Sequence, residues 1–553
     1  MVFEKHIPLS LPPQTSNHSY TGDVGEAMIA RLYKQKGVYR IQVSSEIIRQ
    51  VKFPDKPVML DAHYYTIKCT LLNMVILHEN KVKFTKELGD RKRHLQDLAR
   101  YDAHLPNYLF PFQDTSVRQL ISQKGVLLAD EQGLGKTVQI ITALLIRNEA
   151  PALIICPAHL KFNWLNEFKK FAPELSVEIL SGRNPYPCNG DYLIINYEIL
   201  PYWVQEFKGN LGAIVCDEAH RIKNRKAKCT KAVISLGKRP IKIFATGTPL
   251  VNNPENVWGL VDMINPNILG GYTEFVDYFT TSVTKTILNK KGEPLVKCYG
   301  GKKVEVKRTQ ITGVRNLHIL HKTLRSSCMI RRRKTDVLPD LPNKLFTAIS
   351  VEVKASIRRE AKNATQAILT ALNSMEEQAA FSKVYRELGM AKTKPAIEWV
   401  SDFLETSDDP LVVAVWHRDV ANVLYDKFKD VSVQIIGGVT DKEQRITTFK
   451  EGGKRLLIGN IKTIGTGLTL TNASTMLFVE LPLTAADLLQ VQDRIHRIGQ
   501  THQCNYYYLV AQGTLEDGII RLLDNKTLMA NSVVDGGVDS ITTMDSILRQ
   551  AAT

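Results

Sequence analysis

Short, fully apolar runs recur through the first half of the chain, and longer stretches with helical periodicity separate them. These runs are Val126–Leu128, Leu153–Cys156, Tyr192–Ile195, Ala213–Cys216 and Ile241–Phe244. Apolar runs of this length between helices are typical of parallel strands whose two faces are both covered. The pattern therefore predicts an α/β lobe built on a parallel sheet.

A second series of the same kind begins near residue 411. Its runs are Leu411–Trp416, Gln434–Ile436, Leu456–Ile458, Met476–Val479 and Tyr506–Val510. We therefore expect two parallel-sheet lobes in tandem, which places the protein in the α/β class.

The first 95 residues follow a different pattern. They contain the strand-like runs Val58–Leu60 and Leu72–Leu77 and one helix-like stretch, Glu26–Lys36. This mixture predicts a small accessory domain without catalytic residues. The expected division of the chain is an accessory domain with a role in substrate targeting (1–95), a first lobe (96–280), a basic insertion that completes it (281–345), a helical protrusion or linker (346–390), a second lobe (391–530) and a C-terminal tail (531–553).

The composition describes a globular chain without a membrane segment. Of its 553 residues 44% are hydrophobic, which is enough to bury cores. The apolar runs are too short to span a bilayer, and Met1–Ser10 lacks a signal-peptide pattern. The 8 cysteines form no C-x-x-C pair, which disfavours a zinc ribbon and suits a reducing compartment. We expect a soluble intracellular protein, in a prokaryotic cytoplasm or nucleoid, a virus-infected host, or a eukaryotic nucleus.

Positive charge is concentrated between the two predicted lobes. The chain has 72 Lys and Arg residues against 56 Asp and Glu residues. Residues 281–334 alone contain 15 Lys and Arg residues and two acidic residues. Such a concentration favours a binding surface for a phosphate backbone over a solvated face. The residues of this segment that we expect to contact DNA are Lys302, Lys303, Lys307 and Arg308. Charge alone leaves open a basic enzyme with no nucleic-acid partner.

A glycine-rich loop follows the apolar run Val126–Leu128 and opens a helical stretch that runs to about Arg147. Strand, glycine-rich loop, Lys-Thr and helix together are the context of a phosphate-binding P-loop. Lys136 would neutralise the β- and γ-phosphates of ATP, and Thr137 would ligate Mg²⁺. The expected nucleotide-binding residues of this loop are Asp130, Gly133, Leu134, Gly135, Lys136 and Thr137.

Two further motifs follow predicted strands of the same lobe. Asp217 and Glu218 come directly after an apolar run, where an acid in such folds lies beside the P-loop. Asp217 would hold Mg²⁺, and Glu218 would orient and deprotonate the attacking water. His220, Thr246 and Thr248 would couple the nucleotide site to the other lobe. A polar helix cap and an ordinary turn are the structural alternatives.

The second lobe contributes two arginines. Arg494 and Arg497 are three residues apart on a predicted helix and would share one face. Guanidinium groups in this position suit an arginine finger that stabilises a transferring γ-phosphoryl group. A pair of surface arginines is the alternative reading.

Together these motifs resemble the Swi/Snf-type branch of the superfamily-two helicases over about residues 100–525. The resemblance also covers Trp164 with Glu167 and Asn252 with Asn253, and it explains Asp130, since the P-loop of that family is DEMGLGKT. Its remaining segments here are Arg331-Arg332 with Lys334, Leu341-Pro342 with Lys344, and His496-Arg497-Ile498-Gly499-Gln500. The resemblance implies two RecA-like lobes that use ATP and Mg²⁺ to move along duplex DNA.

A narrower resemblance links the chain to the HARP-type annealing helicases, which remodel forks, and to phage branch-migration helicases. It rests on Tyr108–Gln113, Ala391-Lys392 and Trp416-His417-Arg418, and it implies that Gln113 contacts adenine. Gly467 and Gln490 are also expected at the nucleotide, and Lys462 at the DNA. One departure is Thr469, where the family has Asn.

The expected function is therefore an ATP-dependent translocase or helicase acting on forked or branched double-stranded DNA, by annealing, fork regression or branch migration, in replication, recombination or repair. Two alternatives stay open: a motor that displaces proteins from DNA, as a nucleoprotein remodeller or in a defence system, and a non-catalytic DNA-binding scaffold. We expect a monomer with no membrane partner, and the sequence names no protein partner.

Overall fold

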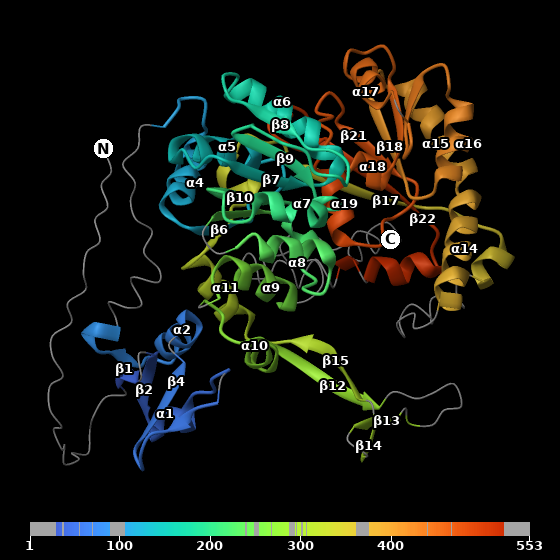
Figure 1. Cartoon of the computed structure of the whole chain (residues 1–553). Helices are drawn as coiled ribbons and strands as arrows, with labels where there is room; N and C mark the ends of the chain where they lie inside the picture. The colour runs from blue at the N-terminus through green and yellow to red at the C-terminus, as the bar shows by residue number, and fades with distance from the viewer. Residues whose placement is uncertain are drawn as a thin grey trace.

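A computed structural model of the chain is shown in Figure 1. It describes residues 29–35, 38–54, 56–68, 70–88, 105–237, 240–247, 254–266, 268–286, 294, 296–299, 302–305, 307–360, 375–439, 441–465, 467–521 and 523–524.

The first lobe is a seven-stranded sheet, and every neighbouring pair of its strands is parallel. Alternate side chains of its strands enter two separate buried clusters: Leu127 and Ile155 belong to one, and Val126 and Ile154 to the other. Burial on both faces explains the continuous apolar runs and confirms the predicted parallel sheet. In spatial order the strands are β16 (Met329–Ile330), β6 (Gly125–Leu128), β11 (Ile241–Ala245), β10 (Ala213–Asp217), β7 (Ala152–Cys156), β9 (Tyr192–Asn196) and β8 (Val177–Ile179).

Helices flank this sheet (Figure 1). Their bounds are α4 (Pro111–Ser122), α5 (Lys136–Arg147), α6 (Lys161–Phe171), α7 (Leu200–Phe207), α8 (Lys228–Ser235) and α9 (Pro254–Ile264), with short 3-10 turns η1 (Ala158–Leu160) and η2 (Ala219–Ile222).

The second lobe is a six-stranded sheet that is also parallel throughout. Its strands in spatial order are β17 (Lys344–Ser350), β22 (Cys504–Val510), β21 (Thr475–Phe478), β18 (Leu411–Val415), β20 (Leu456–Asn460) and β19 (Ser432–Ile435). Its helices are α14 (Met375–Ala391), α15 (Thr393–Thr406), α16 (Arg418–Lys427), α17 (Lys442–Lys450), α18 (Ile461–Ile464) and α19 (Ala485–Gln492). This sheet begins at β17, well before residue 391, because β17 pairs with β22 along its whole length.

Among its described residues, the N-terminal part forms a five-stranded sheet flanked by helices. The strands in spatial order are β3 (Val58–Met59), β4 (Tyr64–Lys68), β2 (Val38–Ser44), β1 (Ile29–Gln35) and β5 (Lys83–Phe84), and the helices include α1 (Ser45–Gln50) and α2 (Leu71–Glu79). Two expectations for its elements are wrong. The expected helix at 26–36 contains β1, which is held by β2 on one side and β5 on the other.

The expected strand at 72–77 is helix α2, which begins after Thr70. The Thr70 hydroxyl accepts a hydrogen bond from the backbone N–H of Asn73 at 3.2 Å. Every side chain from Leu72 to Leu77 is buried, so this stretch lacks the alternation of exposed and buried positions that marks a surface helix. A short apolar run cannot distinguish a buried helix from a buried strand.

The basic insertion extends from the first lobe as a ribbon of strands (Figure 1). Helix α10 (Tyr272–Phe279) leads into β12 (Thr280–Thr286), which pairs antiparallel with β15 (Lys307–Val314). A hairpin of β13 (Val296–Tyr299) and β14 (Lys302–Glu305) lies between them in sequence. The predicted DNA contacts Lys302 and Lys303 fall in β14, and Lys307 and Arg308 fall in β15.

Helix α11 (Leu317–Arg325) returns the chain to the first lobe, where it packs on α2 of the N-terminal part. Two ion pairs join these parts: Lys68 Nζ to Glu274 Oε1 at 2.6 Å, and Lys322 to Glu79. Among the described residues, no helix has the length and apolar content needed to cross a bilayer.

Candidate active site

The P-loop owes its shape to glycines in the left-handed region. Gly133 has φ +85° and Gly135 has φ +72°, and Gly135 caps the N-terminus of α5. A Cβ atom on Gly135 would lie 2.5 Å from Gln113 Nε2, and one on Gly133 would lie 2.9 Å from Arg497 Cβ. Glycine is therefore required both by the backbone angles and by the space. The loop leaves its N–H groups and a helix N-terminus facing one cavity, which suits an anion.

Lys136 begins α5 and folds back over the loop. Its Nζ donates hydrogen bonds to the carbonyl oxygens of Asp130 at 2.9 Å and Glu131 at 3.3 Å. Burial lowers the pKa of Lys136, and the neighbouring carboxylates of Glu218 and Asp217 partly oppose this. A buried ammonium next to carboxylates is the group that a polyphosphate would stabilise.

Asp217 ends β10, and Glu218 follows it with φ +50°. Trp164 Nε1 donates to Asp217 Oδ2 at 2.9 Å, and the Tyr197 hydroxyl donates to the Asp217 carbonyl at 2.7 Å. Burial and the Glu218 charge raise the pKa of Asp217 to about 6. Burial also acts to raise the pKa of Glu218, but the hydrogen bond to His220 and the charge of Lys136 outweigh it, so that pKa is lowered. Of the two carboxylates, Glu218 therefore keeps its charge to the lower pH.

His220 connects Glu218 to the end of the neighbouring strand. Its Nδ1 lies 3.3 Å from Glu218 Oε2 and 3.2 Å from the Thr246 hydroxyl. Thr246 follows β11, and its N–H donates to the carbonyl of Leu128 at 3.0 Å, directly before the P-loop. These contacts lie within the first lobe, so a coupling of His220 and Thr246 to the other lobe stays a prediction, and Thr248 lies outside the described residues.

Arg494 and Arg497 lie in the turns after α19, which ends at Gln492, so the expectation that they share a helix is wrong. They still point toward the same cavity. Arg494 Nη2 lies 3.4 Å from Gln132 Oε1 of the P-loop, and burial lowers its pKa to about 10. Arg497 Nη1 donates to the hydroxyl of Thr469 at 2.8 Å. Thr469, which stands where the family has Asn, therefore helps to orient Arg497.

These groups line one cavity of about 540 Å³ between the lobes. Of the predicted site residues, those that line it are Gly133, Gly135, Lys136, Thr137, Asp217, Glu218, His220, Lys462, Gly467, Gln490, Arg494 and Arg497. Lys462, expected at the DNA, is thus at the nucleotide cavity, with its Nζ 4.8 Å from the centre of the Trp416 ring.

Three residues expected at the nucleotide do not line this cavity. Asp130 is fully buried behind the loop, with its Oδ2 3.5 Å from Arg332 Nη1. The Leu134 carbonyl accepts hydrogen bonds from Gln113 Nε2 and Gln139 Nε2, each at 3.0 Å. Gln113 Oε1 also accepts from the Phe110 N–H at 3.0 Å, so this glutamine braces the P-loop. An adenine contact by Gln113 stays a prediction.

A buried network of charged side chains at the lobe interface could not be predicted from the sequence. Lys334 Nζ, at the edge of the first lobe, donates to Asp493 Oδ1 at 2.7 Å and to the His496 carbonyl at 2.6 Å. Lys344 Nζ donates to the same Asp493 oxygen at 2.9 Å. Burial acts to raise the pKa of Asp493, but the two lysines outweigh it and hold that pKa far below its usual range. Sequence motifs contained both lysines, but their shared carboxylate is 149 or more positions away.

Other cavity residues were also missed. Burial raises the pKa of Glu167 and lowers the pKa of His159 to about 4. Asn163, Thr484 and Asp487 complete this polar wall. Glu167 stood in a recognised motif, but nothing in the sequence showed that it faces Arg497 from the other lobe.

The side chains fit a magnesium-bound nucleoside triphosphate. The P-loop glycines line the cavity together with the cationic side chains of Lys136, Arg494 and Arg497. The Thr137 hydroxyl and the carboxylates of Asp217 and Glu218 line it as well. Thr137 and Asp217 would hold the Mg²⁺ ion, which when bound neutralises charge on the phosphate oxygens.

The comparisons with known proteins agree with this site. The SNF2-related domain matches residues 31–393, and the helicase conserved C-terminal domain matches residues 395–499. The SWI/SNF-related matrix-associated actin-dependent regulator of chromatin subfamily A-like protein 1 of Xenopus laevis is 29% identical over 450 residues, which cover 78% of this chain and 44% of that protein.

A DNA annealing helicase and endonuclease of Mus musculus is 27% identical over 77% of this chain and 41% of that protein. An uncharacterized ATP-dependent helicase of Mycoplasma pneumoniae is 27% identical over 81% of this chain and 44% of that protein. A solved SWI2/SNF2 ATPase core of Sulfolobus solfataricus in complex with dsDNA covers 80% of this chain and 95% of that one, at 23% identity and a TM-score of 0.37. The chain spans less than half the length of these curated relatives. The match over 31–393, together with the helicase-type ATPase site between its lobes, shows that the chain belongs to the SNF2-related family, the Swi/Snf-type branch of the superfamily-two helicases.

Proposed function

We propose that this chain is an ATP-driven motor that moves along double-stranded DNA and acts on forked or branched DNA. The observation that carries the proposal is the meeting of Lys136, Glu218 and Arg494 in one cavity although they come from two lobes. Hydrolysis at such a site requires the lobes to be closed, so each turnover changes their relative position. A motor that grips DNA with both lobes converts this change into movement.

The side chains divide the chemistry between them. Lys136 binds phosphate oxygens, and the lowered pKa of Glu218 keeps it ionised to take a proton from the attacking water. Arg494 brings a positive charge from the second lobe to the γ-phosphoryl group that is transferred to water. The charge is desolvated, as the lowered pKa of Arg494 indicates, so its interaction with an anion is stronger than it would be in water.

The DNA half of the proposal is supported by two observations. The segment 281–334 holds 15 basic and two acidic residues, and β12 to β15 place part of it on a ribbon outside the first lobe. The Mus musculus relative is described as a DNA annealing helicase and endonuclease, and its alignment covers 77% of this chain. This likeness supports the part of the proposal that concerns forked or branched DNA.

The test is the rate of ATP hydrolysis with no DNA, single-stranded DNA, linear duplex, a model fork and a four-way junction. We expect duplex-containing DNA to raise the rate, and the fork or junction to raise it most. A rate that no DNA changes would refute the motor. A rise with linear duplex equal to that with forks would refute the preference for branched DNA.

A further inference from the structure

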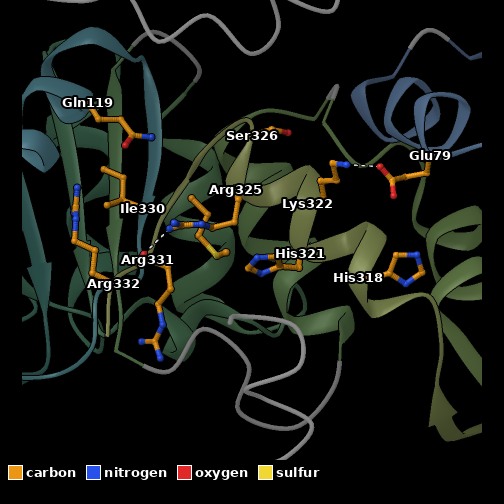
Figure 2. Close-up of a pocket in the computed structure, with 11 residues that line it drawn as sticks. Glu79, Gln119, His318, His321, Lys322, Arg325, Ser326, Ile330, Arg331 and Arg332 are labelled. Carbon is orange, nitrogen blue, oxygen red and sulfur yellow. Dashed lines mark hydrogen bonds and ion pairs between the residues drawn. The ribbon is translucent and has the colours of Figure 1, made fainter. Parts of the chain in front are cut away.

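A second cavity, of about 620 Å³, lies between α11, α2 and the strand β16, with Arg331 and Arg332 beyond that strand (Figure 2). Its basic lining residues are His318, His321, Lys322, Arg325, Arg331 and Arg332. Glu79 is the single carboxylate among the described residues that line it. It shares no lining residue with the nucleotide cavity. Such an excess of cationic side chains around an open space suits an anionic ligand.

Four of these residues form a stripe along α11. Positions 318, 321, 322 and 325 are spaced by three, four and seven residues, so they share one face of the helix. The opposite face is apolar and buried, through Ile319, Leu320 and Leu324. The stripe covers about 10 Å of helix, which is longer than one phosphate group, so it can meet more than one phosphate of a DNA strand.

The other wall of the cavity is joined to the P-loop. Arg331 Nη1 donates to the Ala129 carbonyl at 3.0 Å, and the Ala129 N–H donates to the Ile330 carbonyl at 2.7 Å. Arg332 lies 3.5 Å from the buried carboxylate of Asp130. A ligand that neutralises the arginines of this wall would therefore act on residues held directly against the nucleotide loop.

Glu79 closes one end of the cavity by pairing with Lys322 (Figure 2). The hydrogen bond from Lys322 lowers the pKa of Glu79. The Lys322 side chain is 52% exposed and that of Glu79 is 30% exposed, and pairs in such surroundings are weak. A phosphate group can therefore replace Glu79 as the partner of Lys322 at little cost.

We propose that this cavity binds the phosphate backbone of a DNA arm that lies along the outer surface where the N-terminal part meets the first lobe. The proposal rests on the proposed function, because it assigns a second contact to the same DNA substrate. Helix α11 directly follows the basic strand β15 in sequence, so the ribbon and the cavity form one continuous segment of the chain. A backbone is favoured over a small anion because Lys322 and Arg325 follow His318 and His321 along one face of α11, so donors to phosphate oxygens form a row and not a single cluster.

Two ion pairs of the same kind provide matched variants. Lys322→Gln and Glu79→Gln change the charge of the cavity by one in opposite directions. Lys68→Gln and Glu274→Gln do the same at the other pair between the N-terminal part and the first lobe, outside the cavity. Each control therefore loses an equivalent surface bridge and an equal charge.

Binding of a labelled fork by the full chain is measured at several salt concentrations. We expect Lys322→Gln to weaken binding about 3- to 10-fold and to lower the salt slope by about 1, and Glu79→Gln to strengthen binding about 2-fold. Lys68→Gln and Glu274→Gln should bind like wild type. Equal binding by Lys322→Gln and wild type, or equal losses in Lys322→Gln and Lys68→Gln, would overturn the proposal.

Two further readouts separate the remaining explanations. If tripolyphosphate protects wild type but not Lys322→Gln against heat while fork affinity is equal, the cavity binds small anions and the DNA proposal is wrong. The ATPase rate of wild type with forks is measured in parallel. If no DNA raises it, the proposed function fails; if forks raise it and Lys322→Gln binds them normally, the cavity proposal alone fails.

Discussion

The charge network of Lys334, Lys344 and Asp493 provides the sharpest quantitative test of the lobe interface. Asp493 is 4% exposed and accepts from both lysines through the same oxygen, while Lys334 is 3% exposed. Asp493 is the carboxylate that accepts hydrogen bonds from both ammonium groups, and Glu131 adds a second, more weakly acting negative charge nearby. Asp493→Asn therefore leaves two buried positive charges facing each other, whereas Lys334→Met leaves a neutral pair of Lys344 and Asp493.

The expected costs follow from this difference. Removing one partner of a buried ion pair costs about 3–5 kcal/mol of the free energy of unfolding, and Asp493→Asn should reach that range. Lys334→Met loses two hydrogen bonds but also removes the surplus charge, so we expect about 1–2 kcal/mol. The double variant should cost less than the sum of the two, with a coupling energy of about 1.5–3 kcal/mol.

The assay is urea unfolding of the four proteins of this cycle, followed by tryptophan fluorescence and circular dichroism at one pH and salt concentration. The transition in which the second lobe unfolds is compared, because a two-lobe chain need not unfold in one step. A coupling energy near zero would refute the network. So would equal costs for Asp493→Asn and Lys334→Met.

Further predictions concern pH and the active site. Burial lowers the pKa of Lys334 from 10.5 to about 8, so between these two pH values the unfolded chain holds a proton that the folded chain has released. The free energy of unfolding should therefore rise with pH between about 8 and 10.5. In urea titrations at several pH values, Lys334→Met should lose that rise. Glu218→Gln should lower the turnover of ATP about 100-fold or more while a fluorescent ATP analogue still binds, because it removes the base and leaves the P-loop intact; loss of binding would contradict this. Gly135→Ala should weaken nucleotide binding, since its Cβ would meet Gln113 Nε2 at 2.5 Å at φ +72°; an unchanged dissociation constant would contradict the strain. Trp164→Phe should raise the Mg²⁺ concentration needed for half-maximal ATPase rate, because Asp217 loses a hydrogen bond that favours its charged form; an unchanged Mg²⁺ titration would exclude that role.

The two lobes could be predicted because parallel strands buried on both faces must be apolar throughout. The runs at 153–156, 213–216 and 411–416 all correspond to strands of the two sheets. The strands β8, β16 and β17 were not predicted. Val177, Glu178 and Ile179 of β8 are half-buried, β16 has two residues, and β17 has a mixed burial pattern. Short or partly exposed strands lack the continuous apolar signal.

The elements of the first 95 residues show where local pattern fails. Most residues of α2 between Leu72 and Leu77 are apolar and all of them are buried, because the N-terminal sheet and α11 both cover this part of the helix. Strand β1 contains Arg31 and Lys34, which a helix would also tolerate, and its pairing with β2 decides its form. In both places the tertiary contacts outweigh a weak local preference.

The sequence by itself determined the loop glycines, the adjacent carboxylates after a buried strand and the arginine pair, because backbone angles and strand ends fix such groups locally. It also showed that residues 281–334 carry an excess of positive charge. The tertiary structure alone decided that Asp130 pairs with Arg332 behind the P-loop, that Lys334 and Lys344 share Asp493, and that α11 turns its basic stripe toward α2. The physical reason is that burial and ion pairing depend on residues up to hundreds of positions apart, which meet when the sheets and helices pack.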